Sequence, residues 1–132
     1  MLAWLLAEPA GEAVREALAG AERVVASDLT LVECDRALTR AQVSGRLAEA
    51  DVVELRSGLN AAASGWSVLR LDADVIDRAR RPFPREPLRT LDALHLASAL
   101  AARAAAGQLA LLSLEGRIRA AGRDLGFDVL PA

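Results

Sequence analysis

Leu109-Ala110-Leu111-Leu112-Ser113-Leu114-Glu115 is an apolar run followed by a hydroxyl residue and then a carboxylate. The run 109–112 predicts a buried strand, because four consecutive apolar residues leave no polar face. A helical pattern follows, so Ser113 suits the N-cap of a helix and Glu115 its first turn. In α/β proteins, sites form beyond the carboxyl ends of the strands. The stretch therefore predicts a strand–helix unit with an acid at a candidate site.

The same hydroxyl–carboxylate pattern occurs at Thr90-Leu91-Asp92, where a second helical pattern begins. Thr90 again suits the N-cap, and Asp92 falls in the first turn, where the helix dipole favours negative charge. Two acids in equivalent settings suggest a shared task. Binding a divalent metal is the obvious candidate.

Strands and helices alternate along the rest of the chain. A loop, 82–87, contains three prolines and cannot be helical. Strands separated by helices imply parallel pairing, so the fold class is a three-layer α/β/α sandwich with a parallel sheet, one domain over 1–132. Such a domain usually opens with a strand, whereas this chain opens inside a helical pattern, and we expect the N-terminal strand to be missing. The predicted helices are 1–7, 10–19, 29–43, 47–63, 73–81, 90–106 and 115–125, and the predicted strands are 23–26, 66–71, 109–112 and 127–130.

Composition narrows the class of protein. The chain has 132 residues, 53% of them apolar, yet no apolar run is long enough for a membrane span. Residues 1–7 lack the basic start of a secretory signal, so the expected location is cytoplasmic. The single Cys34 excludes an intrachain disulfide and a cysteine zinc site. A net charge of −2 argues against a general nucleic-acid coat protein.

The basic residues are all arginine, and one stretch concentrates them. Taken alone, this cluster is best interpreted as a solvated helix end and loop. It comprises Arg78, Arg80, Arg81, Arg85 and Arg89.

Three acids are candidates for a site, and each has a plainer explanation. Asp92 lies in an apolar helix, where a buried carboxylate is costly unless it is paired, hydrogen-bonded or bound to a cation. A dipole-favoured first-turn acid is an equally good account of it. Taken alone, Glu115 is a plain first-turn acid of a solvated helix, and Glu33 is one half of an exposed pair with Arg36.

Other polar residues are assigned to structure. Asp28 and Asp72 follow predicted strands at positions that need a helix cap. His95 follows Asp92 by one turn and could ligate a metal, but a hydrogen-bonded core histidine is the favoured interpretation. Cys34 is expected to be a small buried residue.

Three stretches taken in order resemble the PIN-domain family, and more narrowly the VapC-type toxins of bacterial toxin–antitoxin pairs. The specific one is Thr90-Leu91-Asp92-Ala93-Leu94-His95-Leu96-Ala97. The others are Ser27-Asp28-Leu29-Thr30-Leu31-Val32-Glu33 and Leu111-Leu112-Ser113-Leu114-Glu115, with Leu125-Gly126-Phe127-Asp128-Val129-Leu130 closing the chain.

The resemblance implies a ribonuclease that holds Mg²⁺ or Mn²⁺ with acids. Glu33 takes the helical glutamate role, Asp92 that of the central aspartate and Glu115 that of the last acid, which is normally an aspartate. The resemblance also implies an RNA substrate, a homodimer and a cognate antitoxin bound in a groove walled by helices 10–19 and 47–63. The first acid of the family pattern, at the end of an N-terminal strand, is absent here, and we expect Met1 to be an internal residue of a longer chain.

Two other functions are compatible with the sequence. One is a catalytically impaired PIN-fold module that binds an antitoxin or RNA without cleaving it. The other is a helix-rich DNA-binding regulator that uses Arg36 and Arg40, which the parallel-strand pattern and the net charge disfavour.

Overall fold

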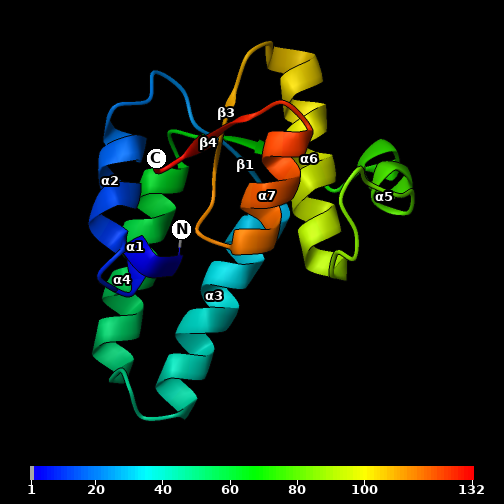
Figure 1. Cartoon of the computed structure of the whole chain (residues 1–132). Helices are drawn as coiled ribbons and strands as arrows, with labels where there is room; N and C mark the ends of the chain where they lie inside the picture. The colour runs from blue at the N-terminus through cyan, green and yellow to red at the C-terminus, as the bar shows by residue number, and fades with distance from the viewer. Residues whose placement is uncertain (1) are drawn as a thin grey trace. The chain divides into compact units, whose positions relative to one another are not determined.

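The computed structural model describes residues 2–132 and shows a mixed α/β protein (Figure 1). The chain divides into two compact units, Met1–Val68 and Leu69–Ala132, which we call the first and second units. No helix within the described residues is both long enough and apolar enough to cross a membrane.

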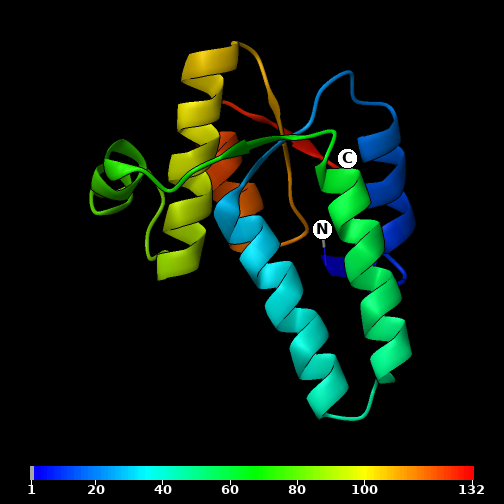
Figure 2. The same ribbon diagram turned by 180° about the vertical axis from the view of Figure 1, so that it is seen from behind.

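The first unit is built around a helical hairpin and a short sheet. The helices α3 and α4 form the hairpin (Figure 2), and β1 pairs with β2 in a two-stranded sheet. Apolar side chains between the helices form the core, which consists of Leu5, Cys34, Leu38, Val52 and Leu59. The elements are α1 (Leu2–Leu5), α2 (Gly11–Ala19), β1 (Val25–Ser27), α3 (Asp28–Val43), α4 (Glu49–Ala63) and β2 (Ser67–Leu69), whose last residue opens the second unit.

Gly11 allows the close approach of α1 and α2. A Cβ atom at this position would lie 2.4 Å from the carbonyl oxygen of Ala3 and 2.9 Å from its carbonyl carbon. Both atoms belong to the backbone, so the contact cannot be relieved by a rotamer change. Only glycine therefore fits here without shifting one helix.

We expect Gly11→Ala to lower the free energy of unfolding by about 1–3 kcal/mol, the usual cost of forcing extra atoms into a packed contact. Gly58 in α4 is the matched control, because a Cβ there meets no atom within 4 Å. Gly58→Ala should raise stability by roughly 0.5–1 kcal/mol through helix propensity. Urea unfolding followed by circular dichroism measures both changes, and equal effects would contradict the close approach.

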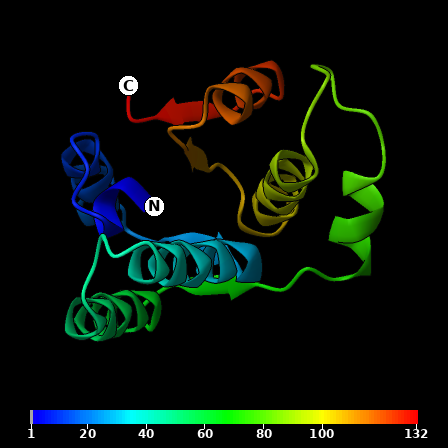
Figure 3. The same cartoon turned by 90° about the horizontal axis from the view of Figure 1, so that it is seen from below.

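The second unit pairs two strands through a helical crossover. β3 (Ala110–Leu112) and β4 (Asp128–Leu130) are parallel, with Ala110 opposite Asp128 and Leu112 opposite Leu130. α7 (Gly116–Asp124) connects them and packs on β4 and on α6 (Thr90–Ala106), as Figure 3 shows. α5 (Ala73–Ala79) packs against α6. The core is formed by Val75, Phe83, Leu96, Ala97, Ile118 and Ala121.

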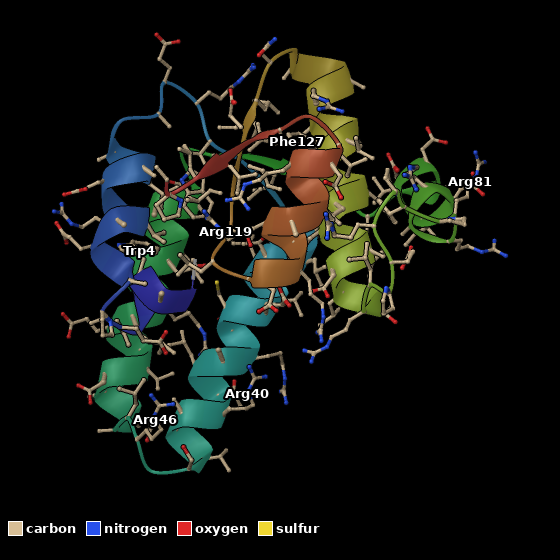
Figure 4. All side chains as sticks on the ribbon, in the orientation of Figure 1. Trp4, Arg40, Arg46, Arg81, Arg119 and Phe127 are labelled. Atoms are coloured by element: carbon tan, nitrogen blue, oxygen red, sulfur yellow. The ribbon has the colours of Figure 1, made fainter. Side chains whose placement is uncertain are left out.

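Arg103, near the end of α6, contacts the turn before β4. Its Nη1 donates a hydrogen bond of 2.9 Å to the carbonyl of Leu125, and its guanidinium lies over the ring of Phe127 at 4.1 Å. The arginine thereby satisfies a carbonyl at the end of α7, where helical carbonyls lack partners. Figure 4 labels Phe127 at this position.

The predicted α/β class and the parallel crossover are confirmed. The helix predicted for 90–106 has those bounds, and most other elements match within a few residues. The first strand begins later than predicted, at Val25, and residue 1 of the predicted helix 1–7 lies outside the described residues. The strands, each of three residues, form two two-stranded sheets, β1–β2 and β3–β4, instead of one. A single domain over 1–132 stays a prediction.

Candidate functional site

Asp92 is the third residue of α6, and its side chain is 7% exposed. Its Oδ2 accepts a hydrogen bond of 3.3 Å from the backbone N–H of Arg89, which occupies the N-cap. The prediction that Thr90 is the N-cap is therefore wrong by one residue, since Arg89 keeps an extended backbone and Thr90 is already helical. The predicted first-turn position of Asp92 is confirmed.

The other oxygen of Asp92, Oδ1, makes no hydrogen bond to any of the residues 2–132. The helix N-terminus stabilises this carboxylate by favouring negative charge. Oδ1 is not one of the buried side-chain atoms that lack a partner, since Ser27 Oγ is the one such atom among the described residues. Asp92 thus keeps one oxygen that no described residue uses and that is available to a cation.

Glu115 stands at the N-cap of α7, one residue before the helix, and its side chain is exposed. Its backbone N–H donates a hydrogen bond of 3.1 Å to the Oγ of Ser113. The positions predicted for both residues are therefore wrong. Ser113 is not the N-cap, and Glu115 occupies the N-cap instead of the first turn. The physical reason is that the serine hydroxyl bonds the backbone two residues on, which holds the chain in a turn instead of starting the helix.

Arg119 binds the carboxyl ends of both strands of the second unit, a role that the sequence did not reveal. Its Nη1 donates to the carbonyls of Ser113 at 2.7 Å and Leu130 at 3.0 Å, and its Nη2 donates to Pro131 at 2.8 Å. The interpretation of this helix face as solvated missed a half-buried arginine (Figure 4). No local sequence pattern marks this role, because two of the three carbonyls that Arg119 binds lie more than ten residues away. The guanidinium fixes the loop that carries Glu115 through the carbonyl of Ser113.

Glu33 lies on α3 of the first unit and is half-buried. Ser27 precedes this helix at the N-cap and is 4% exposed, and its Oγ has no hydrogen-bond partner among residues 2–132. Asp28 is the first helical residue and lies exposed, so it does not occupy the cap position predicted for it. Asp72 does cap α5 as predicted, because its Oδ1 accepts from the N–H of Val75 at 2.9 Å.

Cys34 is 1% exposed, which confirms the prediction of a small buried residue. Burial raises the pKa of its thiol to about 11, and the negative charges of Glu33 and Asp35 act in the same direction. The thiol therefore favours its protonated form near neutral pH, in which it is a weak nucleophile.

Asp92 and Glu115 belong to the second unit and Glu33 belongs to the first. His95 is half-buried on α6, one turn after Asp92. Among residues 2–132, no group of three or more His, Cys, Asp or Glu side chains could hold a metal ion. The donor chemistry of the three acids nevertheless fits a hard cation, which prefers carboxylate oxygens. Metal binding by Glu33, Asp92 and Glu115 stays a prediction.

Comparison with known proteins gives one family. The family model for the PIN domain matches residues 1–123, which is most of the chain. PIN domains are typically nucleases and generally depend on a divalent metal. No match was found among the curated proteins.

Proposed function

The chain belongs to the PIN domain family, and we propose that it is a Mg²⁺- or Mn²⁺-dependent ribonuclease that hydrolyses RNA phosphodiesters. The observation that carries the proposal is the state of Asp92. This carboxylate is buried at the start of α6, and only one of its two oxygens is used by the protein.

The side chains of Asp92, Glu33 and Glu115 would hold the metal. A divalent ion bound there would supply Lewis-acid stabilisation of the phosphate and would lower the pKa of a bound water. The chain's own contribution is orientation. The Arg89 N–H fixes one oxygen of Asp92, and the Arg119 guanidinium fixes the loop before Glu115 through the carbonyl of Ser113.

We propose further that the enzyme is a VapC-type toxin of a type II toxin–antitoxin pair, acting in the cytoplasm as a homodimer. The support is the sequence resemblance, most specific over 90–97. The cognate antitoxin would lay an apolar helix or strand between α2 and α4, which both belong to the first unit.

A second candidate is a PIN-fold module that binds RNA or an antitoxin without cleaving RNA. One observation favours it: residues 2–132 contain no ready-made cluster of three metal-binding side chains. A site that lacks a ligand loses affinity for the ion and geometric control over the reacting phosphate.

The metal requirement separates the two candidates. We expect the purified protein to cleave structured RNA in Mg²⁺ or Mn²⁺, to lose this activity in EDTA, and to regain it when excess Mg²⁺ is restored. Gel electrophoresis of end-labelled RNA measures the cleavage, with Ca²⁺ as a divalent control. RNA binding without cleavage at any Mg²⁺ or Mn²⁺ concentration would establish the binding module, and cleavage that persists in EDTA would contradict metal dependence.

A further inference from the structure

A groove of about 590 Å³ lies in the second unit between α5, the loop after it and the first turns of α6. Figure 1 shows these segments from green to yellow. Its lining combines apolar side chains, including Ile76, Leu88 and Leu94, with the arginines Arg80 and Arg89. Arg81 lines the groove as well. The lining is thus mainly apolar with added positive charge, and we call its apolar part the floor.

Three of the five arginines between residues 78 and 89 already contact other groups of the protein. The prediction of a solvated cluster still holds for Arg81 and Arg85, whose side chains are 67% and 55% exposed in surface ion pairs. Arg78 lies over the Phe83 ring at 4.0 Å, Arg81 pairs with Asp77, and Arg85 pairs with Asp124 at 2.6 Å.

Arg80 and Arg89 are different from these three. Both are exposed, and neither side chain makes a hydrogen bond, ion pair or ring contact with any other described residue. Two guanidinium groups without partners line the same groove. They can therefore bind anions without first breaking a contact.

Glu86 is the acid among the lining residues, and the loop itself uses its carboxylate. Oε1 accepts from the backbone N–H of Phe83 at 3.0 Å, and Oε2 accepts from that of Leu88 at 2.7 Å. These bonds fix the loop that forms one wall of the groove. They also turn the acceptor oxygens of Glu86 toward the loop backbone, although its negative charge remains in the lining beside the two arginines.

The groove is continuous with the residues that hold Asp92. Arg89 and Thr90 both line it, and the N–H of Arg89 donates to Oδ2 of Asp92. An anionic strand that follows the groove would therefore reach the start of α6. We infer that this groove is a subsite for the RNA strand, in which Arg80 and Arg89 bind backbone phosphates and the apolar floor receives a nucleobase. This inference rests on the proposed ribonuclease function.

Size and chemistry favour a nucleotide over a protein segment. The volume lies within the range of about 300–1,000 Å³ that small-ligand sites occupy. A three-turn helix about 10 Å across fills on the order of 1,000 Å³ or more. Sites for single-stranded nucleic acid combine cationic side chains on the phosphates with an apolar face for the bases, which is the combination found here.

RNA binding measured without cleavage tests the inference. Fluorescence anisotropy of a labelled single-stranded RNA in EDTA reports binding by the full chain. We expect Arg80→Ala/Arg89→Ala to weaken binding at least about tenfold at low salt. The dependence of log K on log salt should also become shallower by roughly 1.4, because two phosphate contacts are lost at about 0.7 each for single strands.

The matched control is Arg23→Ala/Arg46→Ala, which removes two exposed arginines of the first unit whose side chains also make no hydrogen bond or ion pair with the described residues. The control should change affinity less than about twofold. Equal losses in both double variants would reduce the effect to net charge and would overturn the subsite. An unchanged affinity in Arg80→Ala/Arg89→Ala would overturn it as well.

Two competing probes test what the groove accepts. If inorganic polyphosphate of the same length displaces the RNA with equal affinity, the floor holds no base and that part of the inference is wrong. If an acidic peptide binds wild type but not Arg80→Ala/Arg89→Ala while RNA binding is unchanged, the groove is assigned to a protein partner.

The outcomes for the subsite and for the enzyme are distinct. RNA binding that depends on Arg80 and Arg89 without cleavage in Mg²⁺ or Mn²⁺ would keep the subsite and reject the ribonuclease. Metal-dependent cleavage by Arg80→Ala/Arg89→Ala with unchanged RNA affinity would keep the ribonuclease and reject the subsite.

Discussion

Replacing Asp92 by asparagine is expected to lower metal-dependent RNA cleavage by at least about a hundredfold, the scale of losing one preorganised electrostatic group at a reacting centre. The asparagine side chain keeps an oxygen that can accept the Arg89 N–H, so the start of α6 is preserved. What the substitution removes is the negative charge on a side chain that is 7% exposed. Mg²⁺ strongly prefers such a carboxylate to a neutral amide.

Asp74→Asn is the matched control for this loss. Asp74 is also an acid in the first turn of a helix of the second unit, but its side chain is exposed. The control should retain cleavage within about twofold. Both variants should melt close to wild type by circular dichroism. If Asp92→Asn is folded and still cleaves RNA at the wild-type rate in saturating Mg²⁺, Asp92 is a structural capping residue and not a metal ligand.

RNA affinity in EDTA gives a second readout for Asp92→Asn. Without metal, the variant should bind at least as tightly as wild type, because it removes a negative charge next to an anionic ligand. Arg80→Ala/Arg89→Ala should lose affinity under the same conditions. The pair of measurements thereby separates a residue that holds the ion from residues that hold the strand.

Sequence rules for helix ends predicted the bounds of helices where interactions between neighbouring residues determine them. The helix from Thr90 to Ala106 could be bounded from sequence, because an acid lies in its first turn and Gly107, with φ of 83°, ends it. The position of Asp92 in its first turn followed from the same reasoning. The register of the N-cap did not, because the preference of threonine for that position chose Thr90, whereas the backbone turns helical one residue earlier.

Interactions between residues distant in sequence could not be predicted in the same way. Arg85 pairs with Asp124 across 39 positions, and Arg119 binds carbonyls at the ends of two strands. Neither contact produces a periodic pattern in the sequence. For this reason the sequence could not show that Arg85 is paired while Arg80 and Arg89 remain available.

The apolar sequence of α6 does not by itself indicate which of its residues are buried. Leu96 is 0% exposed, whereas Leu91 on the same helix is 46% exposed. Both residues are leucine, so amino-acid type alone predicts the same burial for both. The packing of α5 and α7 against α6 separates them.

This difference makes Leu96→Ala the variant with the largest expected effect on stability. Leu96 is fully buried in the core of the second unit, beside residues such as Val75, Phe83 and Ile118. Truncation removes three carbon atoms from a closed contact and leaves a cavity, which typically costs about 2–5 kcal/mol of unfolding free energy.

Leu91→Ala is the matched control, because it makes the same chemical change on the same helix at a half-exposed position. It should cost less than about 1 kcal/mol, since little apolar area leaves a packed environment and alanine has the higher helix propensity. Urea unfolding followed by circular dichroism gives both values. Similar losses for the two variants would mean that the burial of Leu96 does not contribute to stability in solution. A large loss confined to Leu96 would show that the packed face of α6 stabilises the helix that carries Asp92.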